Sequence, residues 1–120
     1  MLIERLFQFL FWSALVFAFI MASLPHPPAL PGNPSDKAQH ILAFLVLSGL
    51  AAVAFPRLRL VVIFLGLAAF GGAIEAVQAI PALGRQTSWI DWLADIAAIA
   101  VVLLLAGVFR LLRRTERAES

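Results

Sequence analysis

The chain contains no cysteine and very few charged residues. Without cysteine it can form no disulfide and no thiolate zinc site, and it has no thiol nucleophile. Asp, Glu, Lys and Arg make up only 13% of its 120 residues, whereas 62% are hydrophobic and the mean hydropathy is +0.97. A soluble domain of this length could not bury so much apolar surface behind a polar shell. We therefore expect lipid to surround most of the chain.

Four apolar stretches are each long enough to cross a membrane, since a transmembrane helix needs about 20 residues that rise about 1.5 Å each. They are residues 6–24, 36–55, 59–80 and 89–112. We predict an all-α membrane protein, a single domain built as a bundle of four transmembrane helices. The first stretch follows Arg5 as a secretory signal would. It is too long for a signal and no small-x-small cleavage site follows it, so we expect a retained helix.

The positions of the basic residues predict how the bundle is oriented, because Lys and Arg in short loops favour the cytoplasm. If the helices alternate in direction, seven cations fall on one side: Arg5, Arg57, Arg59, Arg110, Arg113, Arg114 and Arg117. Only Lys37 and Arg85 fall on the other. Both termini are therefore expected in the cytoplasm, with the loops at 25–36 and 81–88 outside. Cations placed where helices leave a membrane do not form a motif that reads nucleic acid, so no nucleic-acid partner is expected.

Three ionisable residues, on three different helices, lie at one predicted depth. Counted from the nearest cytoplasmic arginine, His40, Glu75 and Asp95 are about 25, 24 and 22 Å into a hydrocarbon core about 30 Å thick. A charged side chain inside the bilayer is unfavourable by roughly 2.5–3.5 kcal/mol, so we expect these groups to turn inward and contact one another. Gly71 and Gly72, one turn before Glu75, would let a neighbouring helix approach closely there.

Each of the three residues has a polar neighbour on the same helix face, three or four positions away: Asp36 with His40, Gln78 with Glu75, and Asp91 with Asp95. For the two outer aspartates an alternative interpretation is local. Asn33-Pro34-Ser35-Asp36 and Ser88-Trp89-Ile90-Asp91 each match the start of a helix, with the first residue as N-cap and the aspartate in the first turn. Capping explains these aspartates as well as a functional role does.

Three motifs follow one another at the helix ends: Asp36-Lys37-x-x-His40, Glu75-x-x-Gln78 and Arg85-x-x-Ser88-x-x-Asp91. In this order they resemble the VanZ-like family of small membrane proteins, named for teicoplanin resistance, over about residues 35–98. The chain departs from the family where Asp95 and Ala98 replace the usual Asn and Gly. The resemblance implies a multi-pass protein of the bacterial plasma (inner) membrane, linked in some members to glycopeptide tolerance. It implies no particular catalytic mechanism.

The leading hypothesis for function is an outward-facing polar pocket that binds membrane lipids. Its ligand would be a lipid head group, a lipid-linked cell-wall intermediate or an amphiphilic glycopeptide. Helix N-termini near residues 34 and 89, together with Lys37 and Arg85, suit a phosphate group. The residues assigned to this ligand-binding pocket are Asp36, Lys37, His40, Glu75, Gln78, Arg85, Ser88, Asp91 and Asp95.

Two other classes of function remain open. In a membrane-embedded hydrolase or transferase, His40 would work with Glu75 or Asp95 as acid and base, or Asp36 would join these three to hold a divalent metal. No other cofactor is predicted, and the chain has no Ser–His elbow, His-Glu-x-x-His pair or Gly-rich phosphate loop. In a structural or assembly protein, the polar layer would only set the register of the helices.

Overall fold

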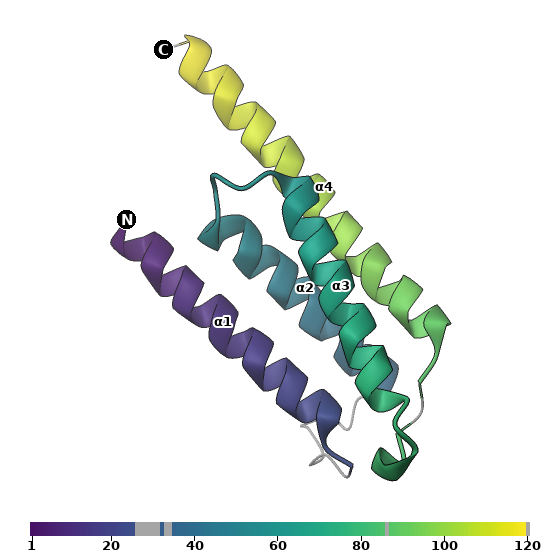
Figure 1. Cartoon of the computed structure of the whole chain (residues 1–120). Coiled ribbons are helices and arrows are strands. Elements are labelled where there is room, and N and C mark those ends of the chain that lie inside the picture. Colours follow the sequence, from purple (N-terminus) through teal and green to yellow (C-terminus); the bar gives the residue numbers. More distant parts are fainter. Residues whose placement is uncertain (26–31, 33–34, 86, 120) are drawn as a thin grey trace.

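The computed structural model describes residues 1–25, 32, 35–85 and 87–119, and in these ranges the regular structure is helical (Figure 1). The helices are α1 Leu2–Ser23, α2 Asp36–Ala54, α3 Leu60–Gln78 and α4 Trp89–Glu119, with a 3-10 turn, η1, at Pro81–Leu83. All four α-helices are long and apolar enough to cross a membrane. The prediction of a four-helix transmembrane bundle is confirmed.

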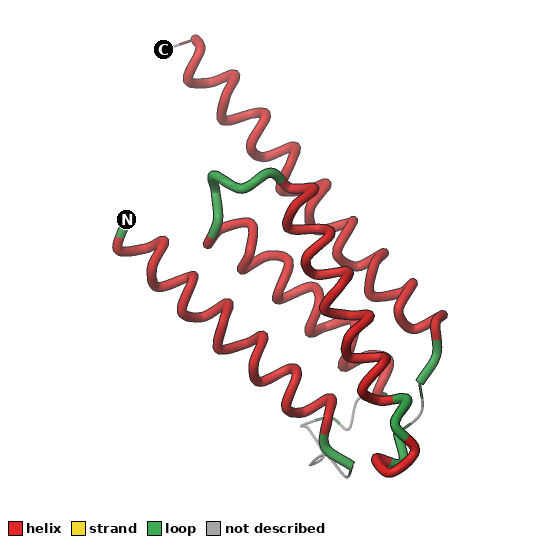
Figure 2. The backbone as a smooth tube through the Cα atoms, viewed as in Figure 1, coloured by secondary structure: helices red, strands yellow, loops and turns green. Residues whose placement is uncertain are grey.

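Helix α2 lies at the centre of the bundle and packs against each of the other three helices. Helix α3 also packs against α4 and α1. The tube in Figure 2 shows that consecutive helices alternate in direction, with the loops confined to the two ends. Both termini therefore leave the bundle at the same end (Figure 1).

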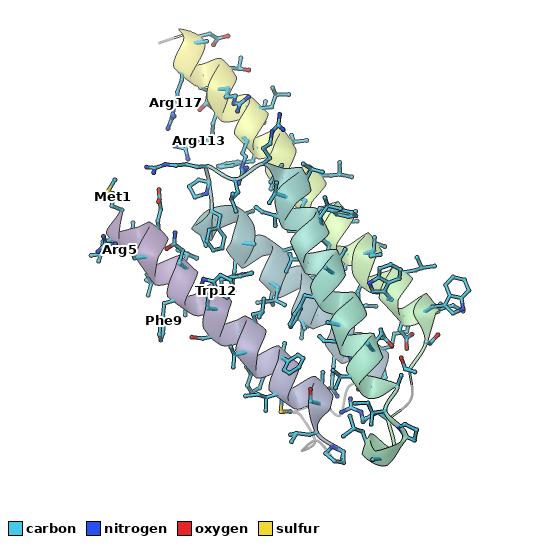
Figure 3. The ribbon with its side chains drawn as sticks, in the orientation of Figure 1. Met1, Arg5, Phe9, Trp12, Arg113 and Arg117 are labelled. Atoms are coloured by element: carbon cyan, nitrogen blue, oxygen red, sulfur yellow. The ribbon has the colours of Figure 1, made fainter. Side chains whose placement is uncertain are left out.

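The core of the bundle is small, as expected for helices that lipid surrounds. Its fully buried side chains come mainly from α2 and α4, and include Phe44, Leu47, Ala54 and Ile99. Large apolar side chains cover the outside, for example Phe9, which is 68% exposed, and Trp12, which is 55% exposed (Figure 3). In water such a surface would drive aggregation, whereas hydrocarbon solvates it without cost.

Helix α4 extends to Glu119, well beyond the predicted end near residue 112. Its last turns consist mostly of Leu, Arg, Ala and Glu, which favour helix, and contain no glycine or proline to end it. Figure 3 shows Arg113 and Arg117 on this extension, past the ends of the other helices. The guanidinium of Arg110 donates hydrogen bonds to the carbonyls of Leu58, at 2.8 Å, and Ala52, at 3.0 Å. It thereby ties α4 to the α2–α3 turn.

Both helices that carry the outer aspartates start with a serine cap, but the aspartate follows the cap at different distances. Ser88 caps α4 as predicted, since its hydroxyl accepts a hydrogen bond of 3.2 Å from the backbone N–H of Ile90. Helix α2 is capped by Ser35, whose hydroxyl accepts from the N–H of Ala38 at 3.1 Å. Asp36 is thus the first helical residue and not the third. The predicted cap at Asn33, with most of the loop at 25–36, lies outside the described residues.

Candidate functional site

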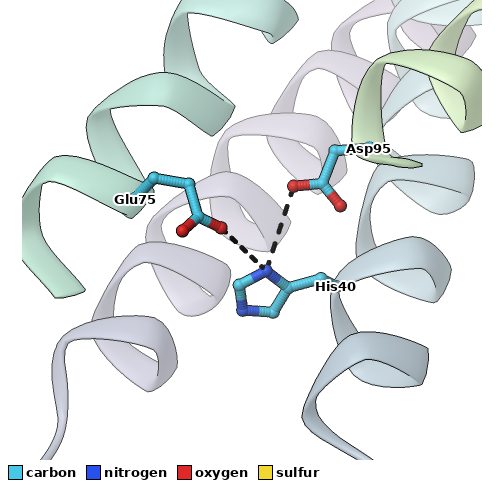
Figure 4. Close-up of side chains that lie close together, drawn as sticks. All are labelled: His40, Glu75 and Asp95. Carbon is cyan, nitrogen blue, oxygen red and sulfur yellow. Dashed lines mark ion pairs between the residues drawn. The ribbon is translucent and has the colours of Figure 1, made fainter. Parts of the chain in front are cut away.

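His40, Glu75 and Asp95 meet in the interior of the bundle, each delivered by a different helix (Figure 4). The Nδ1 atom of His40 lies 3.9 Å from Oε1 of Glu75 and 3.9 Å from Oδ2 of Asp95. The contact expected from their common depth is therefore present. One ligand atom from each residue lies within 4.8 Å of the other two, so the three could hold a metal ion. We call this group the His40 triad.

Three of the four carboxylate oxygens of the triad are buried without a hydrogen-bond donor in the described chain. The side chain of Asp95 is only 2% exposed, and those of His40 and Glu75 are 11% and 12% exposed. Within the described chain, no residue donates a hydrogen bond to Oε1 of Glu75 or to either carboxylate oxygen of Asp95. A buried carboxylate without a partner is strongly unfavourable, so these oxygens require a cation or a proton.

The second oxygen of Glu75 is fully engaged with the start of α4. Its Oε2 atom accepts hydrogen bonds from the hydroxyl of Thr87 and, at 3.2 Å, from the backbone N–H of Ser88. These bonds hold the carboxylate so that Oε1 faces His40. Thr87 was absent from the predicted pocket, and its only sequence signal was its position beside Ser88 at a helix start. Ser88 contributes here through its backbone, while its hydroxyl caps the helix.

Arg85 is bound within the protein and is not available as an open anion site. Its Nη2 atom donates to Oδ1 of Asp36 at 2.9 Å, and its Nη1 atom donates to the carbonyls of Leu24, at 2.7 Å, and Met21, at 3.3 Å. The Arg85 side chain is only 9% exposed. It therefore satisfies carbonyls at the end of α1 and fixes that end to the start of α2.

Asp36 faces the other ring nitrogen of His40, on the side away from Glu75 and Asp95. Its Oδ2 atom is 3.9 Å from Nε2 of His40, whereas Glu75 and Asp95 face Nδ1. Of the four residues predicted as candidate metal ligands, His40, Glu75 and Asp95 lie in the group of atoms that could share a metal, and Asp36 lies outside it. Gln78 is also near Nε2, at 3.4 Å, and its amide donates to the carbonyl of Ala22 at 3.1 Å. Gln78 thereby links α3 to α1.

Two further residues of the predicted pocket, like Arg85, lie apart from the triad. Lys37 is exposed on the first turn of α2. Asp91 lies half-buried one turn before Asp95 on α4, and its carboxylate is outside the group of atoms that could share a metal. Asp91 therefore provides a natural comparison for Asp95, since both are aspartates on the same helix.

An apolar groove of about 270 Å³ runs between α1 and α2 and ends at His40. Its walls include Ala18, Phe17, Ala43 and Val46, and its polar end contains Asp36, His40 and Arg85. Since α1 and α2 run in opposite directions, the apolar walls extend from this polar end toward the middle of the bundle. Phe17 is 60% exposed and Val46 is 47% exposed, so the groove opens to the outer surface of the bundle.

Three comparisons bear on the identity of the chain: with protein-family models, with curated proteins and with solved structures. The motifs Asp36-Lys37-x-x-His40 and Arg85-x-x-Ser88-x-x-Asp91 carry a resemblance to the VanZ-like family that stays a prediction from those residues. The site is defined by the His40 triad and the groove beside it. None of the three comparisons finds a match to this chain.

Proposed function

We propose that this chain is a multi-pass protein of the bacterial inner membrane that binds a membrane amphiphile in the groove between α1 and α2. The ligand class is a lipid or a lipid-linked cell-wall intermediate, with its chain in the groove and its head group at the polar end. Both termini would lie in the cytoplasm, which places the polar end near the outer surface. Retention of such a ligand, or of an amphiphilic glycopeptide, is how the protein would contribute to teicoplanin tolerance.

The observation that carries this proposal is the polarity gradient along the groove. Apolar side chains form its walls, and the ionisable groups of Asp36, His40 and Arg85 gather at one end. A lipid has the same order of apolar and polar parts. The volume of about 270 Å³ is close to the lower limit of about 300 Å³ for small-molecule sites, which suits one chain better than a whole phospholipid.

The ion pair between Arg85 and Asp36 affects which kind of head group the site favours. Because Arg85 is paired with Asp36, the polar end carries no excess positive charge from these two residues. Recognition of a phosphate by Arg85 would require breaking that pair. Lys37 is exposed on the first turn of α2 and is the cation better placed to meet a phosphate at the membrane surface.

Blocking the groove is expected to remove the ligand. Ala18→Phe or Ala43→Phe would place an aromatic ring in the groove, since both alanines line it. Ala97→Phe is the matched control because Ala97 is exposed on α4 and does not line the groove. Native mass spectrometry of the purified proteins with added phospholipids and polyprenyl phosphates should show retained lipid in wild type and Ala97→Phe, and about tenfold less in the groove variants. Equal retention by all four proteins would refute the proposal.

A second candidate function, a membrane-embedded hydrolase or transferase, is favoured by the position of His40. This residue lines the groove and also contacts Glu75 and Asp95. A head group in the polar end would therefore lie against an imidazole that has carboxylates on its far side, as an acid–base pair requires.

The enzyme hypothesis predicts turnover that depends on this imidazole. Incubation of the protein with phospholipid or polyprenyl phosphate should release a product that mass spectrometry detects, and His40→Gln should lower its rate by about 10²-fold or more. Lipid retention by His40→Gln should be preserved. Product formation that is the same in wild type, in His40→Gln and without protein would exclude this function.

A further inference from the structure

We propose that the His40 triad binds one divalent transition-metal ion, with Zn²⁺ as the reference ion. The ligands would be Nδ1 of His40, Oε1 of Glu75 and Oδ2 of Asp95. This inference goes beyond the proposed lipid binding and stands on separate observations, because it depends on the interior face of the triad and not on the groove.

The distances in the triad suit a metal better than direct ion pairs. At 3.9 Å, neither carboxylate oxygen is within hydrogen-bonding distance of His40 Nδ1. Two ligands that are each about 2.1 Å from a tetrahedral zinc ion lie about 3.4 Å apart. The three atoms are within 4.8 Å of one another, so closing around an ion requires shifts of about 1 Å, which side-chain rotation can supply.

Charge balance also favours a divalent ion. Glu75 and Asp95 together carry two negative charges, and a neutral His40 with M²⁺ brings the total to zero. An imidazolium alone would leave one negative charge in a site where Asp95 is 2% exposed. The ion would also satisfy Oε1 of Glu75 and one oxygen of Asp95, which have no donor in the described chain. The competing arrangement is a proton shared between the carboxylates, which predicts no metal dependence.

The ligand set indicates the class of metal. One imidazole nitrogen with two carboxylate oxygens suits Zn²⁺, Mn²⁺ or Fe²⁺, whereas Ca²⁺ and Mg²⁺ take oxygen ligands. Thiolate coordination is excluded because the chain has no cysteine. Three protein ligands would leave one position of a tetrahedral zinc ion open.

Groups around the triad are placed to orient its ligands. Thr87 and the N–H of Ser88 hold Glu75 through Oε2, which directs Oε1 inward. If Nδ1 of His40 bonds the metal, its proton must be on Nε2. The amide nitrogen of Gln78, 3.4 Å from Nε2, then cannot donate to it, and the carboxylate oxygen on that side is Oδ2 of Asp36, at 3.9 Å. A small rotation would bring this carboxylate into hydrogen-bonding range. Asp36 is thus a positioning residue of the type that metal-bound histidines commonly have.

The test is zinc binding by the full-length protein, purified in detergent, freed of any affinity tag and treated with EDTA. Titration with ZnCl₂ and elemental analysis after gel filtration should find one Zn²⁺ per chain. Asp95→Asn and His40→Ala should weaken binding by about 100-fold, and Asp36→Asn by about tenfold. The matched controls are Asp91→Asn, on the same helix, and His26→Ala, which removes the only other histidine. His26→Ala should bind as wild type does. Asp91→Asn should bind far more tightly than Asp95→Asn, because the charge of Asp91 acts on Asp95 but its carboxylate is not one of the ligands.

A second measurement separates lost binding from lost folding. Asp95→Asn removes an unpaired buried charge, so the metal-free variant should unfold at a temperature at least as high as metal-free wild type. Zinc should raise the melting temperature of wild type and leave that of Asp95→Asn unchanged. The proposal is overturned if metal-free wild type binds no Zn²⁺, or if Asp95→Asn and His40→Ala bind it as tightly as wild type. Loss of the groove ligand would leave these results unaffected.

Discussion

Replacing Gly71 with valine is expected to destabilise the folded bundle by about 2–3 kcal/mol, because the position has no room for a side chain. A Cβ atom on Gly71 would lie 3.2 Å from Cζ of Phe44 and 3.3 Å from Cδ1 of Trp92. Phe44 is 1% exposed, and moving its ring would disturb its packing against the ring of Phe70, whose centroid is 6.1 Å away. The Trp92 indole N–H donates a 2.9 Å hydrogen bond to the carbonyl of Ala68, so moving that ring would break the bond.

The same substitution should also disturb the His40 triad. Gly71 lies on α3 one turn before Glu75, at the point where α3 meets α2 and α4 through Phe44 and Trp92. Valine would push α3 away from both helices and move Glu75 away from His40. We therefore expect zinc affinity to fall together with stability.

The measurement for Gly71→Val is unfolding by denaturant in detergent micelles, followed by circular dichroism. Gly66→Val is the matched control, since Gly66 is on the same helix and a Cβ there would meet nothing within 4 Å. The control should change the free energy of unfolding by about 0.5 kcal/mol or less. Equal stability of the two variants would show that close helix approach at Gly71 is unimportant.

Replacing Arg85 with alanine is also expected to have a large effect, lowering the free energy of unfolding by about 3 kcal/mol. The substitution leaves the carbonyls of Met21 and Leu24 without their donor and the carboxylate of Asp36 without its cation. Arg85→Lys should recover only part of this loss, because one ammonium cannot reproduce the two-pronged contact of a guanidinium.

A double-mutant cycle identifies the role of Arg85. The free energy of unfolding is measured under the same conditions for wild type, Arg85→Ala, Asp36→Asn and the double variant. The two substitutions should show a coupling energy of about 1 kcal/mol or more. Lipid retention by Arg85→Ala should stay near that of wild type in whatever fraction remains folded. A stable Arg85→Ala protein that no longer retains lipid would contradict this view and make Arg85 a head-group ligand.

The hypothesis of a purely structural polar layer makes a different set of predictions. Part of the layer is structural, because Gln78 and Arg85 bond to carbonyls of α1 and the start of α4 holds Glu75. Asp95 does not fit that role, since both of its carboxylate oxygens lack donors within the described chain. If the layer only stabilised the bundle, Asp95→Asn would be destabilised and would show no specific loss of zinc binding.

The sequence by itself determined the number of helices and the common level of His40, Glu75 and Asp95 along them. A helix that spans hydrocarbon needs about 20 apolar residues, and a constant rise per residue converts the position of a residue into a level along its helix. From these levels, the sequence predicted that His40, Glu75 and Asp95 would contact one another. Helix start signals were less certain, because Asn33 and Ser35 are both good caps and sequence pattern does not choose between them.

Only the tertiary structure decided how the polar groups are partnered. Contacts between helices depend on helix rotation, crossing angle and side-chain rotamer, and the spacing of residues within one helix contains none of these. The fold turned Arg85 inward onto Asp36 and α1, and it placed Thr87 on Glu75. It also opened the groove between α1 and α2 and left Asp95 facing His40 without a donor. These partnerships distinguish a metal-site candidate from a general layer of polar residues, because a buried oxygen without a donor requires a cation or a proton.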